Sequence, residues 1–188
     1  MSLTGGITLT CADEKMRGGL KRMFLINRTA LTDSSFTPGV YHDYTAVSVA
    51  STSSAANQWH EFEFEDETGS ATFETTINDN NTKSIGGTVT VTIPRQEKIK
   101  AQRLQEALDS CKLVAICETY QGQSFVYGYD QVIGNYGCEA GVNGTNGPTF
   151  DDNNSYEFRL EFRHLEIPRQ FYGTIITGNG AVTLTDPS

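Results

Sequence analysis

The sequence predicts a mainly β fold, either a β-sandwich or a partly closed β-barrel, with one flanking α-helix at about Arg95–Ser110. Two alternating runs indicate the strands. Thr88–Ile93 alternates Val and Ile with Thr, the pattern of a strand with one buried face. Tyr156–His164 alternates aromatic and apolar residues with charges of both signs, and it is the strongest strand signal in the chain. Arg95–Ser110 is rich in helix formers and places apolar residues three and four positions apart, so it indicates the helix.

The expected helix follows one strand and precedes another. Pro94 lacks an N–H group, so it ends the ladder of the strand before it and suits the first turn of the helix. The apolar run Leu113–Cys117 comes after the helix as a further strand. We therefore expect the helix to lie across a sheet formed by Thr88–Ile93 and Leu113–Cys117, with Leu104 and Leu108 buried beneath it.

A hairpin is predicted before this central unit. It joins Trp59–Glu65 to Ser70–Ile77 through the turn Asp66–Gly69, because four linking residues that end in Gly separate two alternating runs. The remaining strand candidates are Ile7–Thr10, Leu20–Ile26, Val40–Ala50, Phe125–Tyr129 and a closing hairpin around Gly178–Gly180.

At 188 residues the chain is expected to form one β-rich domain, residues 1–188. The stretch Gly134–Asp152 holds five glycines and several Asn, and it reads as a long loop. Long loops in compact domains are more often functional or interfacial than idle. We expect this loop and the Trp59–Ile77 hairpin to depend most on neighbouring subunits, because neither carries much core area.

Charge and cysteine content exclude several classes of function. The formal net charge of −9 and the pI of about 4.7 disfavour a general nucleic-acid binder and binding to anionic membranes. No apolar run approaches the roughly 20 residues of a membrane span, and the first residues do not resemble a secretory signal. The cysteines are too irregularly spaced for a zinc site or a disulfide framework, which favours small buried thiols in a reducing compartment. They are Cys11, Cys111, Cys117 and Cys138.

Catalytic and metal-binding motifs are missing from the sequence. No nucleophile elbow, phosphate-binding loop or metalloprotease motif is present. His42, His60 and His164 fall on separate predicted strands, and the structural role is favoured for each, although a Cys–His dyad stays open. Asp151–Asn154 lacks the spacing of a calcium loop, so a solvated turn is favoured. The sequence therefore predicts a protein that is not an enzyme and has no cofactor and no bound metal.

Three glutamates stand out on the strand Trp59–Glu65. Glu61, Glu63 and Glu65 alternate with Phe62 and Phe64. Alternate residues of a strand lie about 6.6–6.8 Å apart, a spacing that does not indicate an acid–base pair, and three carboxylates on a solvent face usually serve solubility. The aromatic residues are expected to turn inward, so the three carboxylates should meet water.

Three further stretches carry a recognisable pattern. Cys11–Arg28 holds a Cys, the pair Gly18-Gly19, a basic pair and a short apolar strand that ends in Asn. Leu104–Gly128 combines a helix, an apolar strand and a Gly-turned hairpin. Asp151–Leu165 is an Asx-rich turn that enters an alternating strand.

With these stretches the chain resembles the tail-tube superfamily of tailed phages and related injection machines. More locally it is similar to tail or virion structural proteins of phages that infect Bacteroides-like hosts. The resemblance implies a non-enzymatic virion subunit that is assembled in the host cytoplasm into hexameric rings around a channel. Its partners would be further copies of itself, other tail or connector proteins, and DNA that passes through without specific binding, with no membrane.

Other functions stay open at this stage. A head–tail connector or a tail-completion ring protein would fit the same particle. A small-ligand-binding β-barrel or an unrecognised hydrolase belongs to a different class, and an open cavity with converging polar groups would favour it. If rings form, we expect Glu61, Glu63 and Glu65 to line the channel, because a negative wall keeps passing DNA from binding.

Overall fold

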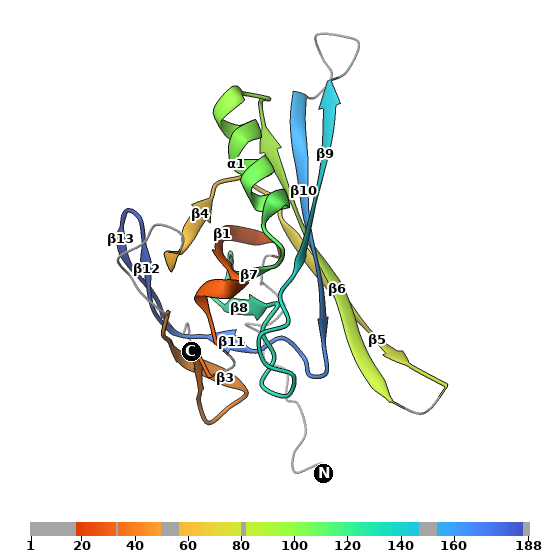
Figure 1. Ribbon diagram of the computed structural model, residues 1–188, viewed down its shortest axis with the longest axis vertical. Helices are drawn as coiled ribbons and strands as arrows, with labels where there is room; N and C mark the ends of the chain where they lie inside the picture. The colour runs from red at the N-terminus through yellow and green to blue at the C-terminus, as the bar shows by residue number, and fades with distance from the viewer. Residues whose placement is uncertain (1–17, 33, 50–56, 80–81, 147–153, 186–188) are drawn as a thin grey trace, which may run out of the picture.

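Two β-sheets packed face to face make up most of the molecule, and a two-stranded sheet lies beside them (Figure 1). The computed structural model describes residues 18–32, 34–49, 57–79, 82–146 and 154–185. The mainly β, sandwich-like prediction with one flanking helix is confirmed for this part of the chain, where the strands do not close into a barrel. The predicted strand Ile7–Thr10 lies outside the described residues.

The larger sheet has seven strands, and its order in space differs strongly from the order in the chain. From edge to edge its strands are β2 (Phe36–Pro38), β3 (Asp43–Val47), β11 (Gln170–Phe171), β8 (Ser124–Tyr127), β7 (Leu113–Thr119), β1 (Leu20–Asn27) and β4 (His60–Phe62). A 3-10 turn, η2 (Arg28–Ala30), follows β1.

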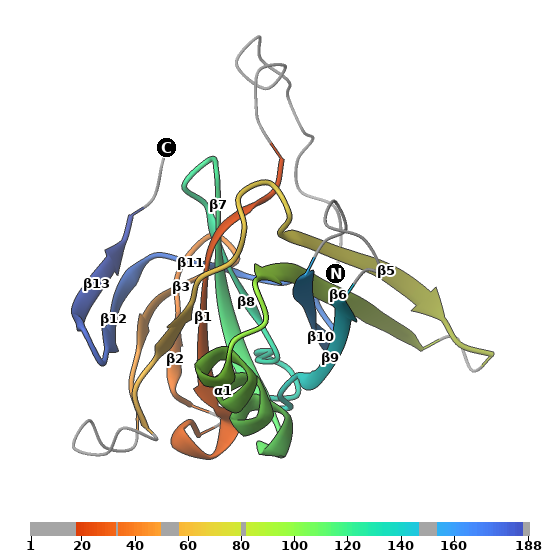
Figure 2. The ribbon, with the colours of Figure 1, turned by 90° about the horizontal axis from the view of Figure 1, so that it is seen from above.

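The smaller sheet of the sandwich has four antiparallel strands. In spatial order they are β5 (Ser70–Ile77), β6 (Lys83–Pro94), β10 (Asn154–His164) and β9 (Glu139–Asn146). The separate hairpin consists of β12 (Gly173–Thr177) and β13 (Gly180–Leu184), as the glycines around Asn179 predict. Figure 2 shows that β5 and β6 project on the side of the molecule opposite to β12 and β13.

The main core fills the space between the two large sheets. The smaller sheet contributes the alternate residues Val89 and Val91 of β6 and Phe158 and Leu160 of β10, all buried. Their alternation with polar residues is what predicted both strands, and β6 and β10 pair along most of their lengths. The strand predicted at Tyr156–His164 is therefore confirmed.

A second core lies on the other face of the seven-stranded sheet. Phe24 and Ile26 of β1 and Val114 and Ile116 of β7 point into it, together with Trp59. Because both faces of the central strands are covered, their sequences are apolar without alternation. This explains the continuous apolar run at the start of β7, in which all five residues are buried.

The helix α1 (Lys98–Asp109) is shorter than predicted at its N-terminal end. Pro94 belongs to β6 rather than to the first turn of the helix. The ladder continues because the N–H of Arg95, which has a positive φ of 63°, donates to the carbonyl oxygen of Asn154 at 2.8 Å. The helix therefore begins only after Glu97, whose side chain makes no capping hydrogen bond.

The position of α1 also differs from the prediction. The strands before and after it, β6 and β7, belong to different sheets, so α1 connects the two layers instead of lying across one sheet. Leu104 is buried at 3% exposure, as expected, and Ala107 is buried beside it. Leu108 is 39% exposed, so the prediction that it is buried is wrong. The face of α1 that packs into the core is therefore narrower than the apolar spacing in the sequence suggested.

The predicted hairpin over Trp59–Ile77 is wrong. β4 pairs with β1 in the seven-stranded sheet, whereas β5 pairs with β6 in the other sheet. The connection between them crosses from one layer to the other at Gly69, whose carbonyl oxygen accepts a hydrogen bond from the N–H of Leu20 at 3.0 Å. A Cβ atom on Gly69 would lie 2.7 Å from the ring of Phe64, so the crossing needs a residue without a side chain.

The prediction of an uninterrupted loop over Gly134–Asp152 is also wrong. β9 (Glu139–Asn146) lies within it and pairs with β10 over eight residues. Its two glycines, Gly141 and Gly144, have low strand propensity, so the sequence pattern does not reveal a strand whose pairing comes from its neighbour. Residues 147–153 lie outside the described part. Among the described helices none has the length and apolar character needed to span a membrane.

Candidate functional site

The three glutamates singled out by the sequence lie along and just beyond the short edge strand β4. Glu61, Glu63 and Glu65 are exposed, as predicted. Phe62 turns the other way and stacks on Phe158 of the facing sheet, with ring centroids 5.7 Å apart and an interplanar angle of 20°. The alternation expected from the sequence is therefore present around β4, although its regular pairing ends at Phe62.

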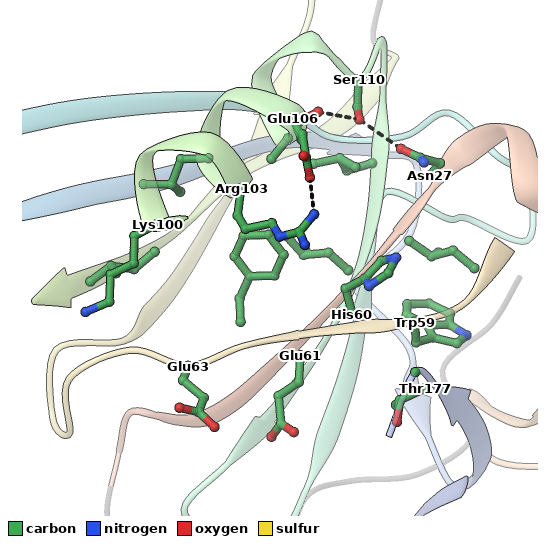
Figure 3. A pocket seen from close by; sticks show the side chains of 18 of the residues that line it. Asn27, Trp59, His60, Glu61, Glu63, Lys100, Arg103, Glu106, Ser110 and Thr177 are labelled. Atoms are coloured by element: carbon green, nitrogen blue, oxygen red, sulfur yellow. Dashed lines mark hydrogen bonds and ion pairs between the residues drawn. The ribbon is translucent and has the colours of Figure 1, made fainter. Parts of the chain in front are cut away.

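A groove runs between β4 and α1 (Figure 3). It has a volume of about 710 Å³, and its apolar floor includes Phe62 and Leu104. His60 and Arg103 lie along it, whereas the side chains of Glu61 and Glu63 point away from the helix. The groove was not predicted, because its walls come from segments far apart in the sequence.

The polar groups of the groove bind mostly to one another. Arg103 forms an ion pair with Glu106 at 2.7 Å, and this hydrogen bond lowers the pKa of Glu106. Ser110 donates a hydrogen bond to the Oδ1 atom of Asn27 at 2.9 Å, and Lys100 donates to the carbonyl oxygen of Pro94 at 2.6 Å. The Ser110 and Lys100 contacts hold the helix against the two sheets, the Arg103–Glu106 pair lies within the helix, and the three contacts do not converge on a common point inside the groove.

The outer face of the four-stranded sheet is a second candidate surface. On β10, Glu157, Arg159, Glu161 and Arg163 are exposed and alternate with buried residues. Threonines of β6 and β5 lie beside these residues in register. Thr88 of β6, for example, pairs with Glu161 of β10 on one side and with a threonine of β5 on the other. Among the described elements, Figures 1 and 2 show no helix and no other sheet over this face.

This outer face carries more negative than positive charge. Its glutamates are Glu74, Glu139, Glu157 and Glu161, and its arginines are Arg159 and Arg163. Arg159 forms an ion pair with Glu161 at 2.9 Å. Lys112, which directly precedes β7, forms an ion pair with Glu139 at 2.7 Å, and this bond lowers the pKa of Glu139. Glu74, Glu157 and Arg163 take no part in these two ion pairs, so the charge that is left on the face is a small net negative one.

Neither edge of this sheet pairs with a further strand in the described part of the chain, although the side chain of Gln96 donates to the carbonyl oxygen of Thr145 on β9 at 3.3 Å. β5 occupies one edge and β9 the other, and each is eight residues long. Neither contains proline or lysine, which commonly protect exposed strand edges. Such edges present a row of backbone donors and acceptors that another strand can pair with.

The three histidines lie apart, as their separate predicted strands imply. His42 Nε2 is 2.8 Å from the carbonyl oxygen of Ile167, and His60 lines the groove. His164 is buried, and its Nε2 atom accepts a hydrogen bond from the N–H of Gly128 at 3.0 Å. His164 is therefore part of the core, whereas His60 lies on β4, the edge strand of the seven-stranded sheet. The two histidines do not share a site.

The described cysteines are not arranged as a nucleophile with its base. Cys117 and Cys138 are buried, as predicted, and burial raises the pKa of both thiols. Cys111 is exposed, so the prediction of a buried thiol is wrong at that position. Cys11 lies outside the described residues. A buried thiol with a raised pKa is a poor nucleophile, because the thiolate is the reactive form.

No metal site is evident in the described part of the chain, where no three His, Cys, Asp or Glu side chains are placed to hold an ion together. Most of the Asp151–Asn154 turn lies outside that part. The best-connected carboxylate is Asp130, which is buried and accepts hydrogen bonds from four backbone N–H groups. Those donors are residues 132 and 133 of its own loop and residues 165 and 166 after β10, so Asp130 joins two loops and has a structural role.

No family model matches this chain, and no curated protein and no solved structure matches it.

Proposed function

We propose that this chain is a structural subunit of a tailed-phage virion, of the tail-tube type. Copies would assemble in the host cytoplasm into rings, hexameric by the resemblance, around a channel that conducts DNA. One observation carries the proposal: in the described part of the chain, the four-stranded sheet has two edges of equal length that pair with no further strand, and a polar face that no other sheet covers. A subunit of this kind needs no catalytic residues and no cofactor.

The two edges favour a head-to-tail joint between subunits. β5 and β9 lie on opposite sides of one sheet, so pairing β5 of one copy with β9 of the next uses different surfaces on each partner. A heterologous contact of this kind generates a ring when its rotation closes. The sheet has four antiparallel strands, an even number, so β9 and the next β5 would also run antiparallel.

The ring would have a continuous wall of strands. The outer face of each sheet would form the channel surface, while the buried face stays packed on the seven-stranded sheet. Its threonines and its excess of glutamate over arginine suit a hydrated channel for DNA. Phosphate contacts need basic groups, so a wall with a net negative charge, to which Glu74 and Glu157 contribute, would let the nucleic acid pass without binding.

Glu61, Glu63 and Glu65 are the second candidate for the channel wall. They are exposed, and repulsion between copies would be tolerable in a wide, hydrated space. We place the four-stranded sheet on the wall because its edges supply the means of closing a ring, whereas β4 offers only three paired residues. The head–tail connector and tail-completion roles would use the same joint.

The alternative of another class receives less support. A small-ligand site is usually a well-formed apolar pocket with a few converging polar groups. The groove beside α1 is large enough, but Arg103 and Glu106 pair with each other within α1 and Ser110 bonds to Asn27, so these groups do not converge on a ligand position. A hydrolase would need an activated nucleophile, and the buried thiols with raised pKa values do not supply one.

Cysteine cross-linking tests the joint directly. In a background with Cys11→Ser and Cys111→Ser, Thr72→Cys places a thiol on β5 and Asn143→Cys places one on β9. We expect the chain with both new cysteines to give a ladder of covalent multimers on oxidation, ending at the ring. Native mass spectrometry and negative-stain imaging of the same sample should give a closed ring or a tube.

The single-cysteine chains are the matched controls. A head-to-tail joint brings β5 against β9, so neither Thr72→Cys alone nor Asn143→Cys alone should form covalent dimers. Dimers of the Thr72→Cys chain would indicate a two-fold β5–β5 contact, which closes at two copies and contradicts the ring. A strict monomer at high concentration, with no ladder from the double variant, would overturn the proposed function.

A further inference from the structure

At the outer end of the hairpin β5–β6 two apolar side chains of β5 are exposed, although Ile85 on the same face is buried and Lys83 lies opposite Ile77. We call this region, residues 73–77 with 83–87, the overhang. Phe73 is 48% exposed and Ile77 is 65% exposed. They lie on the same face of the sheet as Val89 and Val91, which are 1% and 0% exposed where the seven-stranded sheet covers them. Figure 2 shows this hairpin extending beyond the body of the molecule.

The chain enters the described structure at the base of this same hairpin. The N–H of Leu20 bonds to the carbonyl oxygen of Gly69, the residue directly before β5. The carbonyl oxygen of Gly19 accepts a hydrogen bond from Tyr120 at 3.3 Å. The residues before Gly18 are therefore attached next to the first residue of β5.

The length and pattern of those residues fit the overhang. Seventeen residues precede the described part, and Ile7–Thr10 alternates Ile and Leu with Thr. From Gly18 back to Leu9 an extended chain reaches about 30 Å. The eight residues of β5 span roughly 26 Å, so Ile7 and Leu9 can reach Ile77 without leaving the same molecule.

We propose that the N-terminal segment, residues 1–17, packs on the overhang of its own chain, with Ile7 and Leu9 against Phe73 and Ile77. Covering these side chains removes apolar area from water, which stabilises the end of the hairpin, where residues 76 and 77 pair with residues 83 and 84 beyond the end of β10. Attachment at the base of the arm gives the segment a high effective concentration, which favours its own arm over that of another copy. The inference does not rest on the proposed ring.

Disulfide trapping in the full chain tests the contact. In the Cys11→Ser, Cys111→Ser background, we expect Leu9→Cys with Ile77→Cys to form an intrachain disulfide at least ten times faster than a control pair. The control is Leu9→Cys with Ile176→Cys, because Ile176 is an isoleucine on β12 with similar exposure, 46%. Equal rates for the two pairs, or cross-links only between chains, would overturn the proposal.

Hydrogen exchange gives an independent measure at a concentration where the chain is monomeric. Replacing Ile7 and Leu9 together by Asp should speed exchange of the 73–77 amides at least tenfold. The matched control replaces Thr8 and Thr10 by Asp and adds the same charge on the alternate residues. The proposal fails if the first variant exchanges like the unmodified chain, or if both variants exchange equally fast.

Discussion

The N–H of Gly128 donates a hydrogen bond to Nε2 of His164 across 3.0 Å inside the core. This contact requires an unprotonated Nε2, so the imidazole is neutral with its proton on Nδ1. Nδ1 has no hydrogen-bond partner in the described structure. Burial lowers the pKa of His164 from 6.5 to about 4, although the charges of Asp130 and Glu166 act in the opposite direction.

This lowered pKa predicts a loss of stability in mild acid. Below pH 6.5 the unfolded chain takes up a proton at His164 that the folded chain does not, so unfolding becomes more favourable as pH falls towards 4. The contribution of His164 to the free energy of unfolding should fall by roughly 3 kcal/mol between pH 6.5 and pH 4 and then level off. Urea unfolding at a series of pH values measures it. The step should shrink in His164→Gln and persist in His42→Gln, and an identical step in both variants would contradict the assignment.

The two leucines of α1 should respond very differently to truncation. Leu104→Ala removes a buried side chain and should destabilise the protein by about 2–5 kcal/mol. Leu108→Ala truncates a side chain that is 39% exposed, so the loss should be below about 1 kcal/mol. Chemical denaturation of the two variants measures both losses of stability. Equal losses would mean that the helix sits on the sandwich in another orientation.

Adjacent glycines of β6 provide a matched pair. A Cβ atom on Gly87 would lie 2.4 Å from the carbonyl oxygen of Thr72 and 2.5 Å from the ring of Phe162. Gly87→Ala should therefore destabilise by about 1–3 kcal/mol, because the strands must shift. Gly86 has no atom within 4 Å of the same position, so Gly86→Ala should change stability by less than about 1 kcal/mol. Thermal denaturation measures the melting temperature of each variant. A lower melting temperature for Gly86→Ala than for Gly87→Ala would refute the packing described.

Charge reversal distinguishes the two candidate channel walls. Lysine at Glu74 and Glu157 adds positive charge to the outer face of the four-stranded sheet, and assembled particles should then retain DNA. The same change at Glu61, Glu63 and Glu65 should leave the fold intact, because all three are exposed. DNA retained after washing is the readout. Retention only with the second set would place those glutamates on the wall.

The strands that the sequence predicted well are those with one buried face. β6 and β10 alternate because the main core lies on one side and solvent on the other. β1 and β7 were visible as apolar runs because both of their faces are covered. The pattern in each case is a direct result of local burial.

The errors came from features that only the tertiary structure decides. The residues 66–69 suit a hairpin turn, but the contact between Leu20 and Gly69 sends β5 into the other sheet. β9 is poor in strand-forming residues and owes its form to β10. The groove between β4 and α1 and the outer face of the four-stranded sheet were not predicted, because each is formed by segments far apart in the sequence. The alternating charges of β10 were visible, but their alignment with Thr88 and Glu74 depends on strand pairing between distant segments.

The pairing of β6 with β10 has a consequence for how the protein forms. Pro94 pairs with Ser155 and Ile85 pairs with His164, so the centre of the four-stranded sheet joins segments separated by the helix and three strands. Contacts this distant slow folding, and proteins dominated by them fold in about milliseconds to seconds. During synthesis β5 and β6 emerge well before β10, so their apolar face is exposed to solvent until β10 can pair with β6. The chain is therefore most prone to aggregation before its last third has left the ribosome.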